Sequence, residues 1–174
     1  SQLVFVGQMS WFPNRDGMEW LLAEVLPRVV AARPEVRLIV VGKSDGLRVP
    51  RDVAANVQLT GFVDDVRPYV DGAAVYVVPL RSGSGTRLKI LEAMALGKAI
   101  VTTTTGAEGI SLEPGSEALF ADSPAEFAEA VVRLLGAPHD IIRLGQAARA
   151  RAETSYGWDA IGRALLPVYA ALSG

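Results

Sequence analysis

The chain has 174 residues, half of them hydrophobic, which is the length and apolar content of one globular domain. A net charge of −2 leaves no basic surface for nucleic acid. The absence of cysteine excludes disulfides and thiolate chemistry, and the single histidine, His139, excludes a multi-histidine metal site. No apolar run approaches the roughly 18 residues that a membrane-spanning helix needs.

Short β-branched runs alternate with helical patterns along most of the chain. The predicted strands are continuous apolar runs, typical of strands covered on both faces: Leu3–Val6, Arg37–Val41, Val57–Leu59, Val75–Val78, Ala99–Thr102 and Ala118–Phe120. The predicted helices are Gly17–Ala32, Val66–Tyr69, Thr86–Leu96, Pro124–Leu135, Pro138–Glu153 and Trp158–Leu172. This alternation predicts an α/β fold: a three-layer, doubly wound parallel sheet of about six strands, Rossmann-like, with strand order 3-2-1-4-5-6 and two closing C-terminal helices.

The loop after the first strand, Gly7–Gly17, stands where a dinucleotide-binding motif would lie. It lacks G-x-G-x-x-G, which argues against a nicotinamide or flavin site. One interpretation is a helix entry, with Asn14 or Asp16 as N-cap and Trp11–Phe12 forming a hydrophobic staple. The other places Asn14 or Arg15 near a bound phosphate.

The loops after the second and third strands are the next candidates for binding. Gly42 opens a loop that is either a plain surface turn or part of the wall around a base or ribose. After the third strand, Asp64 or Asp65 is expected to cap a short helix, and the backbone at Phe62 and Val63 is placed to read a base edge.

The glycine-rich turn Gly83–Gly85 is the strongest signal. A helix is expected to begin near Thr86 and carries Arg87, Lys89 and Glu92 in its first turns. Unpaired N–H groups and the positive end of the dipole at a helix N-terminus favour phosphate. Taken separately, these residues would be a flexible loop and a surface pair with i,i+3 spacing. Together they favour a phosphate or sugar site.

Two further features support that site. Glu92 lies within the apolar run Ile90–Leu96, where we expect its charge to need partners. After the fifth strand, Thr104, Thr105 and Gly106 add hydroxyls and backbone N–H groups. Because ligands of open α/β sheets bind outside the carboxyl ends of the strands, we expect these loops to converge on one site.

These segments together resemble the donor-binding domain of a retaining glycosyltransferase of family 4, which is one half of a GT-B fold. The resemblance covers essentially the whole chain, and the L-E-A-M-A-x-G signature is its most specific part. P-N near the start, G-S-G-T-R-L-K before the signature and T-G-A-E-G after it resemble a bacterial subgroup that builds cell-surface or exported polysaccharide. The segments that carry the resemblance are Gly7, Leu59–Val63, Val78–Leu80 and Leu91–Val101.

The resemblance assigns roles to several residues. It implies that Glu92 binds the ribose hydroxyls, that the Gly83–Thr86 loop contacts the diphosphate and sugar through its backbone, and that Thr104–Gly106 border the same pocket. The family usually has two glutamates with seven residues between them, and the partner position of Glu92 is Ser84 in this chain.

The family also usually has an arginine and a lysine in the first loop, where this chain has Gln8 and, roughly, Asp16. We therefore predict that Arg87 and Lys89 supply the charge for the diphosphate and act as the catalytic cations.

The implied reaction moves a sugar from a nucleoside-diphosphate sugar, of UDP or GDP type, to a hydroxyl acceptor with retention and without metal or other cofactor. Residues 1–174 would be the donor domain. The chain opens directly on a strand, which suggests that something precedes Ser1. The resemblance implies that this is an acceptor domain, because GT-B enzymes have two Rossmann-like domains with the active site between them, and that the isolated domain is inactive. The full-length enzyme would be cytoplasmic or peripheral at the inner face of the membrane.

Three alternatives remain at this point. An epimerase or hydrolase acting on nucleotide sugars would need acid and base carboxylates, for which Glu92 and Glu108 are available. A non-catalytic binding domain is the second alternative, and a nicotinamide-binding domain is a distant third. The sequence leaves open the base, the sugar, the acceptor and the oligomeric state.

Overall fold

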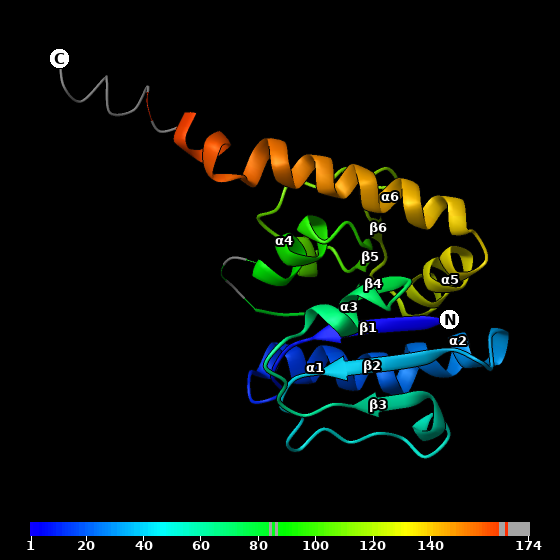
Figure 1. Cartoon of the computed structure of the whole chain (residues 1–174). Helices are drawn as coiled ribbons and strands as arrows, with labels where there is room; N and C mark the ends of the chain where they lie inside the picture. The colour runs from blue at the N-terminus through cyan, green and yellow to red at the C-terminus, as the bar shows by residue number, and fades with distance from the viewer. Residues whose placement is uncertain (84, 86, 164–165, 167–174) are drawn as a thin grey trace.

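The computed structural model describes residues 1–83, 85, 87–163 and 166. Its centre is a parallel sheet in the order β3-β2-β1-β4-β5-β6 (Figure 1). The strands are β1 (Gln2–Val6), β2 (Arg37–Val41), β3 (Val57–Leu59), β4 (Val75–Val78), β5 (Ala99–Thr102) and β6 (Leu119–Phe120). The predicted α/β fold, number of strands and strand order are confirmed.

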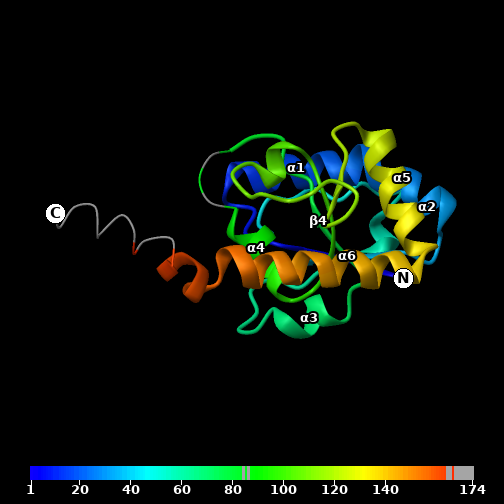
Figure 2. The same cartoon turned by 90° about the horizontal axis from the view of Figure 1, so that it is seen from above.

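Helices cover both faces of the sheet (Figures 1 and 2). They are α1 (Phe12–Trp20), α2 (Leu26–Ala32), α3 (Arg67–Asp71), α4 (Leu88–Ala95), α5 (Pro124–Leu135) and α6 (Pro138–Arg151). A π-helical turn, Leu21–Val25, joins α1 to α2, and a second one, Ala152–Tyr156, extends α6. Residues 158–163 are helical again.

The core consists of one apolar layer on each face of the sheet. One layer contains Phe5, Trp20 of α1 and Phe127 of α5. The rings of Trp20 and Phe127 meet edge to face, with 5.6 Å between their centroids. The other contains Ile90 and Met94 of α4. Because both faces are covered, β4 and β5 are buried along their whole length, as their continuous apolar runs predict.

The first helix begins five residues earlier than predicted, at Phe12 instead of Gly17. Trp11 is its extended N-cap and makes no side-chain cap, while Pro13 in the first turn preorganises the backbone. The prediction of Asn14 or Asp16 as N-cap is therefore wrong, because both lie inside the helix. The predicted staple is also wrong, since the Trp11 and Phe12 side chains are 43% and 60% exposed.

The other helix ends are closer to expectation. Asp65 Oδ1 accepts a hydrogen bond from the backbone N–H of Arg67, the first residue of α3, at 2.9 Å. Gly97, at φ +64°, ends α4. Trp158 is 88% exposed and so does not belong to the core of this domain. None of the helices in the described part of the chain is long and apolar enough to cross a membrane.

Candidate functional site

The strand order reverses direction between β1 and β4, so the loops that leave these strands diverge and open a crevice. Two adjoining hollows of about 260 Å³ each lie there and share Val6 and Val66. We call them together the β1 crevice. The first hollow is lined by Val6, Gly7, Gln8, Val41, Gly42, Lys43, Phe62, Val63 and Val66.

Three predicted residues, Gly42, Phe62 and Val63, meet in this first hollow. Gly42 has φ +123°, and a Cβ there would lie 2.5 Å from the carbonyl oxygen of Gly7. Its N–H donates to the carbonyl of Gly61 at 3.1 Å. The loops after β1, β2 and β3 therefore meet backbone to backbone, and the Phe62 side chain, 67% exposed, presents a flat apolar surface.

The second hollow contains Glu92, together with Arg67, Val70, Tyr76, Ala95, Leu96 and the shared valines. The expectation that this charge is buried and needs partners is wrong, because α4 turns Ile90, Ala93 and Met94 inward and leaves Glu92 exposed. The described part of the chain gives its carboxylate no ion-pair partner. The carboxylate is thus available to a ligand in the crevice.

Tyr76, a residue that the sequence analysis missed, lines the same hollow. Its hydroxyl is buried and has no hydrogen-bond partner among the described residues. Burial, reinforced by the charge of Glu92, raises the pKa of this phenol above its ordinary value. Within the apolar run of β4 a tyrosine reads as one more core residue, so periodicity offers no signal for this position.

Lys89 points from α4 toward α1. Its Nζ donates to Oδ1 of Asn14 at 2.6 Å and lies 4.3 Å from the centroid of the Phe5 ring. Burial lowers the pKa of the Lys89 ammonium to about 7, with a smaller opposing effect from Glu92 and a further lowering by Arg87. Lys89 and Glu92 therefore do not form the i,i+3 surface pair: Glu92 is exposed, whereas Lys89 is half-buried and contacts α1.

Arg87 precedes the first residue of α4, and its side chain is almost wholly buried. Its Nη2 donates to the carbonyl of Gly83 at 2.9 Å and to Glu108 at 3.3 Å. Nε and Nη1 have no partner among the described residues. A buried guanidinium with unfilled donors is a ready partner for an anion. Gly83 and Gly85 are exposed beside it.

Two members of the predicted glycine loop, Ser84 and Thr86, lie outside the described residues. The predicted Thr104–Gly106 segment is held by internal bonds. The N–H and Oγ1 of Thr104 both donate to Asp122, at 2.7 and 2.6 Å, and the buried Gly106 donates to Oγ1 of Thr103 at 2.9 Å. This segment is absent from the linings of the two hollows, although Glu108, which follows it, contacts Arg87.

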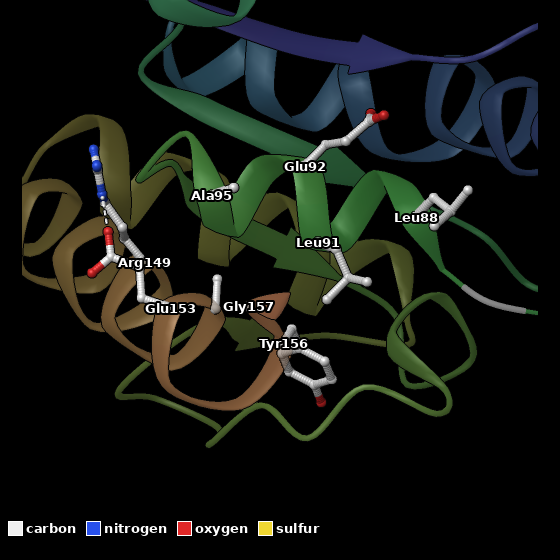
Figure 3. A pocket seen from close by; sticks show the side chains of 9 residues that line it. Leu88, Leu91, Glu92, Ala95, Arg149, Glu153, Tyr156 and Gly157 are labelled. Atoms are coloured by element: carbon white, nitrogen blue, oxygen red, sulfur yellow. Dashed lines mark hydrogen bonds and ion pairs between the residues drawn. The ribbon is translucent and has the colours of Figure 1, made fainter. Parts of the chain in front are cut away.

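A larger hollow of about 540 Å³ lies on the other side of α4, against the end of α6 (Figure 3). Arg149 and Glu153 at its edge pair with each other at 2.9 Å. Glu92 also lines this hollow, and Figure 3 shows its side chain pointing away from Tyr156. Glu92 therefore borders both this hollow and the β1 crevice. The described residues contain no group of three acidic or histidine side chains arranged to hold a metal ion.

Residues 1–137 match the family profile described as glycosyl transferases group 1. The chain belongs to this family. It is 31% identical to the phosphatidyl-myo-inositol mannosyltransferase of Mycolicibacterium smegmatis, over 99% of this chain and 45% of that protein. It is 27% identical to the GDP-mannose-dependent monoacylated alpha-(1-6)-phosphatidylinositol monomannoside mannosyltransferase of Corynebacterium glutamicum, over 87% and 43%.

The fold is shared with Anabaena HepE, a GT-B neighbour solved in complex with UDP. The TM-score is 0.77 at 15% identity, over 98% of this chain and 48% of that one. This chain thus spans less than half the length of each of these three proteins. Its family does not favour the epimerase or hydrolase alternative.

Proposed function

We propose that this chain is the donor-binding half of a glycosyltransferase that moves a sugar from a nucleoside-diphosphate sugar to a hydroxyl acceptor with retention. The observation that carries the proposal is the carboxylate of Glu92, which stands without an ion-pair partner among the described residues and borders the β1 crevice. A carboxylate accepts hydrogen bonds from vicinal hydroxyls, as a ribose offers. The exposed ring of Phe62 and the backbone at Val63 give a base an apolar surface and polar edges.

Arg87 and Lys89 are the proposed partners of the diphosphate. At the position where the family usually has a lysine, Asp16 is paired with Arg81 at 2.6 Å. Lys89 reaches across from α4 and places an ammonium against Asn14, two residues before that position. A cation is thus supplied to the first loop from another part of the chain. Cations and helix N–H groups placed there would stabilise the departing diphosphate.

The names of related proteins bear on the donor and the acceptor. One relative is named for GDP-mannose and one structural neighbour was solved with UDP, so we propose a donor of GDP or UDP type. The M. smegmatis relative is named for phosphatidyl-myo-inositol. We extend from this that the acceptor is carried at a membrane surface and that the full-length enzyme works peripherally on its cytoplasmic side, with an acceptor domain that completes the site.

Calorimetric titration of the chain with UDP, GDP and ADP tests the donor site. We expect saturable binding of UDP or GDP, reduced more than tenfold by Glu92→Ala, by Arg87→Ala and by Lys89→Ala. The matched control is Glu129→Ala, which removes an exposed glutamate from α5. Binding that survives Glu92→Ala unchanged would contradict the assignment of Glu92. No binding of any of the three nucleotides by the wild-type chain would contradict the donor site.

A further inference from the structure

A second feature that needs an explanation is the buried side chain of Asn14, in the first turn of α1. It is 5% exposed, and both ends of its amide are engaged inside the protein. Its Nδ2 donates to the carbonyl of Gln8 at 2.9 Å, and its Oδ1 accepts from Nζ of Lys89 at 2.6 Å. One side chain therefore joins the loop after β1, the first turn of α1 and the helix that follows β4.

The surrounding residues are shaped to admit this amide. A Cβ on Gly7 would lie 2.7 Å from Asn14 Nδ2, so a larger residue there would displace this amide. The neighbouring Pro13 packs against the other loop, since a Cβ on Gly83 would lie 3.0 Å from its Cγ. Pro13 and Asn14 thus contact both segments that follow β4: Pro13 packs against the loop at Gly83, and Asn14 bonds Lys89 of α4.

We propose that Asn14 is a positioning residue that holds Lys89 toward the diphosphate and sets how readily this lysine takes up its proton. The inference rests on the proposed function, because it concerns the cation assigned there to the donor. In this proposal Asn14 acts through Lys89 and not by contacting the donor, because it is 5% exposed and its Nδ2 and Oδ1 each bond a group inside the protein. It acts by giving the ammonium an acceptor inside an apolar setting.

The electrostatics of the site support this role. The charged groups that act on Lys89 are Glu92 of α4 and Arg87, which immediately precedes this helix. The contacts that reach it from β1 and α1 are neutral: the ring of Phe5 and the amide of Asn14. Asn14 is thus the polar group from outside α4 that favours the ammonium. With its pKa near 7, Lys89 would be recharged by an arriving diphosphate, so donor binding would take up a proton.

The test changes the charge of this one group. Asn14→Asp keeps the shape of the side chain and places an anion against Lys89, which should raise the pKa of the lysine by about one unit or more. Asn14→Leu removes the hydrogen-bond acceptor of Lys89 and should lower the pKa of this lysine. The chain has three lysines, so ¹³C-labelled lysine resonances, assigned with Lys89→Met, report the Lys89 titration in the ligand-free chain.

The same variants are then titrated with UDP and GDP between pH 6 and pH 9. We expect the affinity of the wild-type chain for nucleotide to fall above pH 7. In Asn14→Asp the same fall should occur at higher pH, and Asn14→Leu should bind about tenfold more weakly at pH 7. The matched control is Asn56→Asp, which alters an amide that bonds the carbonyls of Pro34 and Val36.

Two negative results are distinguishable. A wild-type chain that binds neither nucleotide at any pH overturns the proposed function and this inference with it. The inference alone is overturned if the wild-type chain binds nucleotide but neither Asn14 variant changes the pKa of Lys89 or the pH profile of binding. Opposite shifts of the profile in Asn14→Asp and Asn14→Leu are the positive result, because a merely structural defect would weaken binding equally at every pH.

Discussion

The half-buried Lys89 predicts an unusual pH dependence of stability, which can be measured without any ligand. The pKa of Lys89 is about 7 in the folded chain, against 10.5 for an unperturbed lysine. Between these values the unfolded chain holds a proton that the folded chain has released. The free energy of unfolding contributed by Lys89 therefore rises with pH through this window.

The size of the effect follows from the shift. The slope is about 0.7 kcal/mol per pH unit at pH 7, where the folded lysine is half-protonated, and approaches about 1.4 above pH 8. Integrated from pH 7 to pH 9, Lys89 adds about 2 kcal/mol to the stability of the folded chain. Lys89→Met removes this gain. It also breaks the bond to Asn14, whose dependence on the protonation of Lys89 is already contained in the pKa shift.

The assay is urea unfolding of the wild-type chain, Lys89→Met and Lys43→Met at pH 7 and pH 9. Lys43 is an exposed lysine and serves as the matched control. We expect the wild type and the control to gain about 2 kcal/mol more than Lys89→Met over this interval. An equal gain in all three proteins would refute the reasoning, because it would mean that Lys89 is solvated and titrates as an ordinary lysine.

Three further predictions concern stability. Ser123→Ala removes the capping box of α5 and should cost about 1 kcal/mol in urea unfolding, with Ser123→Asp largely restoring it. Gly145→Ala drives a Cβ into the backbone of Gly97 and should lower thermal stability by about 2 kcal/mol or more, whereas Gly162→Ala, with open space around it, should not. Asp122→Ala removes the acceptor of two bonds from the loop after β5 and should cost about 1 kcal/mol, with faster amide exchange in that loop; unchanged exchange there would show that the bonds are not what orders it.

Much of the architecture follows from local patterns. The continuous apolar runs of β4 and β5 could be satisfied only by burial on both faces, and this requirement implies a parallel sheet with helices on either side. The family followed from the signature around Glu92, because those residues are contiguous. The start of α1 was misplaced because the sequence offered two competing signals, a proline at 13 and a glycine at 17, and the proline prevailed.

The site depended on packing that no local pattern encodes. The apolar run around Glu92 suggested a buried charge, but the rotation of α4 about its axis decides which side chains face the sheet, and that rotation is set by contacts of Ile90 and Met94 with the core.

The amino-acid sequence was thus enough to predict the strands and most of the helices, the strand order, the family and the loops that could form a site. The tertiary structure alone decided the direction of Glu92, the place of Tyr76 in the crevice, and the contact between Asn14 and Lys89, which lie 75 positions apart. Helical hydrogen bonds and apolar periodicity act over a few residues and can therefore be recognised in the sequence. The pairing of distant side chains depends on how whole helices sit against the sheet, which is fixed only when the chain has packed.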